Sequence, residues 1–175
     1  MVTGEIVDLE DWEYAWASHV GLQRMISRFG SKDSPQYDNN TKQPELLATV
    51  ATCCCELAVA KCLNVYWAGH FWDARDHGLH KDRIADVGNN TEVRRVRNRE
   101  NPVWIDPKDV KANRIIVAAH AEAPEYRRVI VWGWIDAADG YEKGDAADPR
   151  SGRRKLELGY LNPIQGIRGK CRTSA

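Results

Sequence analysis

The chain has 175 residues, of which 43 % are hydrophobic and 29 % are charged, a composition typical of a single globular domain. Its 25 basic and 25 acidic residues cancel, so a global attraction to nucleic acid is excluded and such binding would need a local basic patch. We find no run of eighteen apolar residues and no apolar leader in the acidic N-terminal segment, so we expect neither a membrane span nor a signal peptide.

The first predicted element is an amphipathic helix over residues 9–29. Trp12 and Trp16 begin a stripe of apolar residues at helical spacing, which we expect to face the core. Asp8 or Asp11 is a suitable residue for capping the start of this helix. The helix therefore forms the first layer that covers a core.

The second predicted helix covers residues 45–64 and follows a polar segment, 30–43, that we expect to be a mobile loop. Between Leu46 and Ala60 it carries a single charge, Glu56, which predicts a helix that is buried nearly all round. It also holds three consecutive cysteines. Three successive side chains on a helix fan out too widely to hold one metal ion, and adjacent cysteines are poor disulfide partners. We therefore expect reduced thiols and a cytoplasmic protein.

The rest of the chain predicts mainly strands. Two short strands flank a Gly-Asn-Asn turn, and two longer apolar strands form a hairpin. These four strands are expected at residues 84–87, 91–97, 114–120 and 127–136. Between and after them we expect a turn-rich connection at 104–114, a polar loop at 138–155 and a last strand or edge at 156–161.

This order of two helices followed by strands predicts an α+β fold, with a central mixed sheet of four to five strands flanked by helices. We expect a single domain over residues 1–175. Its parts would be the N-terminal helix and loop over 1–43, the core over 44–137, and a C-terminal loop and edge segment over 138–175.

Glu56 is the first candidate site residue, because a buried carboxylate without a partner is costly. It needs a metal ion or a basic residue. A purely structural ion pair with one of the arginines at 94–99 remains an open alternative.

Asp86 and Glu92 stand on either side of the Gly-Asn-Asn turn. In the second strand Glu92 and Arg94 point to the same face. If Glu56 also faces them, three carboxylates converge beside one fixed cation, and oxygen ligands of this kind suit Mg²⁺ or Mn²⁺. Such a site can cleave a phosphodiester, with Arg94 offsetting the charge on the phosphate.

Basic residues near this turn and near the C-terminus are candidates for contact with a nucleic-acid backbone. For the C-terminal cluster, a solvated loop is the alternative. The candidates are Arg95, Arg97, Arg99, Arg153 and Arg154.

The order of a helix glutamate followed by Asp-turn-Glu-x-Arg resembles the PD-(D/E)xK nuclease superfamily. Segments 12–24, 55–67, 86–98 and 129–139 also resemble a group of small bacteriophage-encoded proteins associated with that fold. The resemblance implies a restriction-endonuclease-like core and Mg²⁺- or Mn²⁺-dependent cleavage of DNA. By the same match, Glu56, Asp86, Glu92 and the Val93 carbonyl take the metal-site positions. A phage-encoded protein would act in the host cytoplasm.

Arg94 stands where this superfamily usually has a lysine. Arginine can bind a phosphate, but it cannot release a proton near neutral pH. Lys61 is an alternative, although the helix period points it away from Glu56.

The second functional hypothesis is a catalytically degenerate protein that keeps the fold and binds DNA or a host protein, for example as an inhibitor of a host enzyme. A homodimer also remains open. A third hypothesis is a zinc site, although the spacing of its four candidate ligands fits no familiar zinc motif. These ligands are Cys62, His70, His77 and His80.

Trp132 and Trp134 alternate with smaller residues in the strand over 127–136, which predicts that they share one face. Core packing and stacking on a nucleobase are both open to them.

Overall fold

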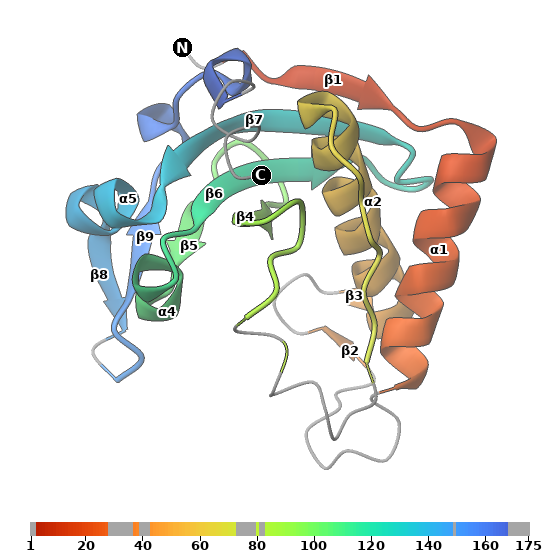
Figure 1. Ribbon diagram of the computed structural model, residues 1–175, viewed down its shortest axis with the longest axis horizontal. Helices are drawn as coiled ribbons and strands as arrows, with labels where there is room; N and C mark the ends of the chain where they lie inside the picture. The colour runs from red at the N-terminus through yellow and green to blue at the C-terminus, as the bar shows by residue number, and fades with distance from the viewer. Residues whose placement is uncertain are drawn as a thin grey trace.

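The computed structural model describes residues 3–27, 37–38, 43–72, 80, 83–148 and 150–167, which fold as α+β. Its centre is a four-stranded sheet in the order β1-β7-β6-β4, in which β4 and β6 are parallel and the other pairs antiparallel (Figure 1). The strands are β1 (Glu5–Asp8), β4 (Thr91–Arg95), β6 (Ile115–Ala121) and β7 (Arg128–Asp136). The predicted mixed sheet flanked by helices is therefore confirmed, and so are the strands expected at 114–120 and 127–136.

Helices α1 (Asp11–Ile26) and α2 (Glu45–Leu63) pack against each other and cover one face of the sheet (Figure 1). Both helices confirm the sequence prediction. In the sequence between α1 and α2 are two short paired strands, β2 (Tyr37–Asp38) and β3 (Gln43–Pro44). The remainder of the loop expected at 30–43 lies outside the described residues.

The start of α1 differs from the prediction. Glu10 is the N-cap and forms a capping box with Glu13, so neither Asp8 nor Asp11 caps the helix. The predicted apolar stripe is also wrong at its beginning, because Trp12 is 63 % exposed. This occurs because the face of α1 that packs on α2 is built from smaller residues, which let the helices approach closely. Its buried residues are Glu13, Ala17, Val20 and Gly21.

Helix α2 is the centre of the core, as its sequence predicts. Cys53, Cys54 and Cys55 are fully buried, and within the described residues no disulfide is formed. Burial raises the pKa of the Cys54 thiol to about 12, so this thiol stays protonated. By length and composition the segment Leu46–Leu63 passes as a membrane span, but 72 % of it is buried within the fold, as is usual for a core helix.

A second layer lies on the opposite side of the central sheet, where the sequence predicted connections and a loop (Figure 1). It contains β5 (Val103–Ile105), α4 (Pro107–Lys111), α5 (Ala137–Lys143), β8 (Asp145–Asp148) and β9 (Arg153–Leu156). Strands β5, β9 and β8 form a three-stranded sheet. The predictions of a turn-rich connection at 104–114 and a polar loop at 138–155 are therefore wrong, because β5 and β9 pair across about fifty residues and no local pattern reports such a long-range pairing.

The C-terminal described segment forms two short 3₁₀ helices, Leu158–Tyr160 and Ile164–Ile167. The strand expected at 156–161 is wrong except for Leu156, which ends β9. Beyond the first of these helices, Asn162 pairs with Trp134 of β7.

The strand expected at 84–87 is also wrong, since only Val87 pairs, through a single antiparallel bridge to Thr91. The turn between these residues is present as expected. The backbone pairing stops after this bridge. The next amide of β4 that points away from β6 is that of Val93, and it donates to the Asp86 carboxylate instead of to a backbone carbonyl. The strand expected at 91–97 ends at Arg95.

The expectation that Trp132 and Trp134 share a face is wrong. The pairing of β7 with β6 shifts between Ala118 and Ala119, so a bulge interrupts the alternation of side chains. Trp134 joins the core cluster around α2, whereas Trp132 packs against the second cluster. The packing interpretation is confirmed for Trp134, which is 6 % exposed.

Candidate functional site

The candidate site is built around β4, the edge strand of the described central sheet. Val93 belongs to the core cluster around α2, so its side chain lies on the α2 face. Glu92 pairs in register with Ile116, a residue of the second cluster, and therefore lies on the opposite face. Glu56 approaches from α2. The two glutamates thus come from opposite faces of the sheet and meet around the edge of β4.

Asp86 occupies that edge. One of its carboxylate oxygens accepts a hydrogen bond from the Val93 amide at 2.9 Å. The N–H and C=O of one strand residue point to the same edge, so the Val93 carbonyl also faces outward from the sheet. The short bridge between Val87 and Thr91 fixes this turn. Asp86 therefore lies between Glu92 and Glu56.

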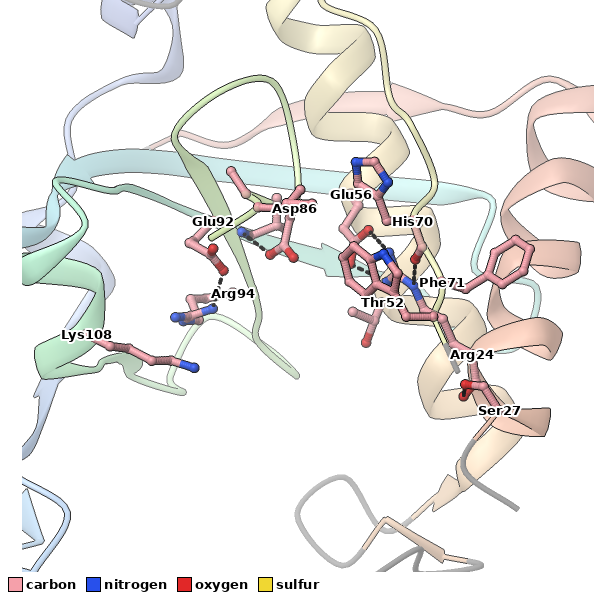
Figure 2. A pocket seen from close by; sticks show the side chains of 14 residues that line it. Arg24, Ser27, Thr52, Glu56, His70, Phe71, Asp86, Glu92, Arg94 and Lys108 are labelled. Carbon is pink, nitrogen blue, oxygen red and sulfur yellow. Dashed lines mark hydrogen bonds and ion pairs between the residues drawn. The ribbon is translucent and has the colours of Figure 1, made fainter. Parts of the chain in front are cut away.

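A cavity of about 250 Å³ opens at this edge, and Glu56, Asp86, Glu92, Val93 and Arg94 all line it. Figure 2 shows the carboxylates in a row, with Asp86 in the middle. The structure thus brings together every residue that the sequence proposed for the metal or the chemistry. The other lining residues are Arg24, Ser27, Thr52, His70, Phe71, Trp72, Ile84, Ala85 and Lys108.

Burial and a neighbouring carboxylate perturb the ionisation of Glu92. Burial and the neighbouring Asp86 raise its pKa to about 8, although the nearby Arg94 acts in the opposite direction. Arg114 also approaches, with 3.6 Å between its Nε and a Glu92 oxygen. A divalent cation at this place would relieve the repulsion between Glu92 and Asp86.

Glu56 is 2 % exposed and is held by Arg24 of α1. Arg24 donates two hydrogen bonds to its carboxylate, at 2.6 and 2.8 Å, and the Trp67 indole donates a third at 3.1 Å. Burial raises the pKa of Glu56, and Asp86 adds to this effect, whereas Arg24 lowers it. The ion pair considered for Glu56 therefore exists, but its partner is Arg24 and none of the arginines at 94–99.

Arg94 is fixed by three acceptors. Its guanidinium donates to Asp109 at 2.5 Å, to Glu92 at 3.2 Å and to the Trp104 carbonyl at 3.2 Å. The predicted sharing of one face by Glu92 and Arg94 is confirmed by this ion pair. Asp109 is buried and also closes the capping box of α4. The capping box is visible in the sequence as Asp-Pro-x-Asp, but no sequence pattern indicates that Asp109 pairs with Arg94.

Among the described residues that line the cavity is Lys108 of α4, which the sequence analysis missed. The candidate Lys61 lies elsewhere, because its ammonium contacts Glu13 at 2.7 Å and the Asp8 carbonyl at 3.1 Å. The geometry thus agrees with the helix period in pointing Lys61 away from Glu56.

The candidate nucleic-acid contacts are distributed over several surfaces. Arg97 and Arg99 are exposed beyond the end of β4, and Arg153 is exposed on β9. Arg95 acts electrostatically on Cys55, which places it on the α2 face. Arg154 donates to the Gly144 carbonyl and lies over the Tyr141 ring, so it faces inward from β9.

The zinc hypothesis gains no support from the described ranges. Cys62 donates to Glu5, whereas His70 lines the cavity and stacks on Trp72; His77 lies outside the described residues. In this part of the chain no three His, Cys, Asp or Glu side chains form a group that could hold a metal ion, and this includes the three cavity carboxylates as they stand. Comparisons with family models, with curated proteins and with solved structures found no match to the chain.

Proposed function

We propose that this protein is a divalent-metal-dependent nuclease that hydrolyses DNA. The observation that supports it best is the convergence of Asp86, Glu92 and Glu56 on one cavity that also contains Arg94. Carboxylates that crowd together disfavour their own ionised forms, and a hard cation is the usual compensation. Burial is the main cause of the raised pKa of Glu92, and the neighbouring Asp86 adds to it.

The donor set fits Mg²⁺ or Mn²⁺ with two protein carboxylates. Asp86 keeps one oxygen beyond its bond to Val93, Glu92 lines the same cavity, and the Val93 carbonyl shares the edge. Magnesium commonly uses only one or two carboxylates and completes its shell with water and substrate phosphate. When bound, such an ion would polarise the phosphate and make bound water more acidic.

The remaining residues act on the substrate directly. Arg94 presents a guanidinium beside Glu92, where it binds and neutralises the phosphate. Glu56 is held rigidly by Arg24 and Trp67, so its carboxylate orients water at the rear of the cavity. Lys108 adds a second positive charge at the cavity wall.

The finer assignment, a restriction-endonuclease-like core of bacteriophage origin acting in the host cytoplasm, is part of this proposal. The sequence resemblance supports it, together with the helix glutamate and the Glu-x-Arg strand at one cavity. The mixed sheet flanked by helices is compatible with that core.

The alternative is a degenerate site whose acidic residues serve only structure. The ion pairs favour it: Glu56 is occupied by Arg24, and Arg94 by Glu92 and Asp109. On this alternative the protein would bind DNA or a host protein without cleaving it.

The deciding experiment is a cleavage assay on labelled single-stranded, duplex and branched DNA, with Mn²⁺, with Mg²⁺ or with EDTA. Asp86→Asn is the test variant, because the amide oxygen can still accept the Val93 hydrogen bond and preserve the turn. Asp139→Asn on the exposed part of α5 is the control. Metal-dependent cleavage that is lost only in Asp86→Asn supports the nuclease. Absence of cleavage on every substrate favours the degenerate site.

A further inference from the structure

The outer face of the small β5-β9-β8 sheet carries an exposed aromatic residue between two buried ones. Val103 and Ile105 are fully buried, whereas Trp104 is 42 % exposed. Trp104 pairs in register with Lys155 of β9, and the Lys155 ammonium lies 5.1 Å from the centre of the indole ring. The ammonium lies over the indole ring, so the two side chains form one cation–π pair on this face.

A second cation continues this surface along β9. Arg153 is two residues from Lys155 and therefore points to the same face. It is exposed and contacts Asp106 at 3.1 Å. Asp145 of β8, which pairs with Lys155, is a second acidic residue near this face besides Asp106. We call Trp104, Arg153 and Lys155 the outer basic face.

The outer basic face adjoins the cavity. Arg94, which lines the cavity, donates to the backbone carbonyl of Trp104 at 3.2 Å. Lys108, another lining residue, belongs to α4, which begins two residues after the end of β5. The backbone of Trp104 therefore lies next to two elements that line the cavity.

We propose that the outer basic face binds an unpaired DNA strand next to the phosphate held in the cavity. A base stacks on Trp104, and the neighbouring phosphates contact Lys155 and Arg153. Paired bases inside a duplex offer no free ring surface for such stacking, so the substrate is single-stranded at this point. The connection to the cavity rests on the proposed nuclease function, but the binding surface itself does not.

The test measures binding of a fluorescein-labelled oligothymidylate of about twelve nucleotides by fluorescence anisotropy, in EDTA so that no cleavage occurs. We expect Trp104→Ala to weaken binding at least tenfold and Trp104→Tyr to restore most of it. Lys155→Gln is expected to reduce the salt dependence of binding by about one phosphate contact. The control is Trp12→Ala, which removes a more exposed tryptophan from α1. Circular dichroism verifies that each variant is folded.

Equal affinity of wild type and Trp104→Ala overturns the proposal, and so does tighter binding of a duplex of the same length. Absence of nucleic-acid binding by the wild type also overturns it and turns attention to a protein partner for this face. DNA binding that depends on Trp104, without cleavage of any substrate, supports this inference and contradicts the proposed nuclease function. Metal-dependent cleavage together with equal DNA affinity of wild type and Trp104→Ala supports the nuclease and contradicts this inference.

Discussion

Arg24 donates a hydrogen bond from each terminal nitrogen of its guanidinium to the Glu56 carboxylate, although the two residues are separated by 32 positions in the sequence. Its Nε also donates to the His70 carbonyl at 2.7 Å. One side chain thus joins α1, α2 and the segment that follows α2 at the wall of the cavity (Figure 2). Burial by itself would lower the pKa of Arg24, but Glu56 outweighs it and raises that pKa, so the arginine stays charged.

Arg24→Met is expected to lower the free energy of unfolding by about 3–5 kcal/mol, because it leaves the buried Glu56 carboxylate without a counter-charge. Urea denaturation at neutral pH measures this loss. The double variant Arg24→Met with Glu56→Gln should recover much of the stability. Arg128→Met is the control, because its ion pair with Glu122 is exposed and should contribute less than about 1 kcal/mol. Equal losses in the two single variants would contradict the role given to Arg24.

Glu92 should make the metal-free protein less stable as the pH rises. Its pKa in the folded state is about 8 and its ordinary value is 4.5, so between these pH values the folded state holds a proton that the unfolded state has released. Unfolding free energies measured in EDTA should therefore fall from about pH 4.5 to about pH 8. Glu92→Gln should flatten this fall, whereas Glu100→Gln at an exposed position should not. Parallel profiles for wild type and Glu92→Gln would refute the assignment.

On the proposed function, the same linkage predicts how a bound metal ion would act. Mg²⁺ or Mn²⁺ must displace the proton from Glu92, so the stabilisation it gives should increase as the pH approaches about 8. Melting temperatures with Mg²⁺ and with EDTA across this range test the prediction. Asp86→Asn should abolish the difference. A metal effect of the same size in Asp86→Asn would place the ion elsewhere.

Lys108 is expected to support cleavage through its charge at the cavity wall. Lys108→Met should lower the cleavage rate at least tenfold, because one positive charge near the phosphate is lost. Lys111→Met, an exposed position at the end of the same helix, is the matched control. Initial rates at saturating Mn²⁺ provide the measurement. Similar rates in the two variants would exclude a catalytic contribution from Lys108.

Gly133 is required where the C-terminal segment meets β7. Its φ of +155° is rare for other residues, and a Cβ there would overlap the Asn162 carbonyl. Gly133→Ala should destabilise the protein by about 2–4 kcal/mol, because backbone on both sides would have to move. Gly159→Ala, where an added Cβ meets open space, should change stability by less than about 0.5 kcal/mol. Thermal unfolding of the pair distinguishes these outcomes.

The sequence by itself determined the parts of this protein that depend on local pattern. The first long helix follows from apolar periodicity, the second from an apolar run that carries one charge, and the hairpin strands from runs of β-branched residues. The charge of Glu56 stood out because an apolar helix makes one carboxylate conspicuous. The turn before β4 placed Asp86 near Glu92, because the residue types that favour a turn are adjacent in the sequence.

Tertiary structure alone decided the partners of these residues. Arg24 reaches Glu56, and Asp109 reaches Arg94, only after distant elements pack, and no local pattern encodes such pairs. The same holds for the small sheet, in which β5 and β9 pair across about fifty residues and place Lys155 beside Trp104. Periodicity indicates which side of a helix or strand is buried. Which residues cover that side depends on how the whole chain folds.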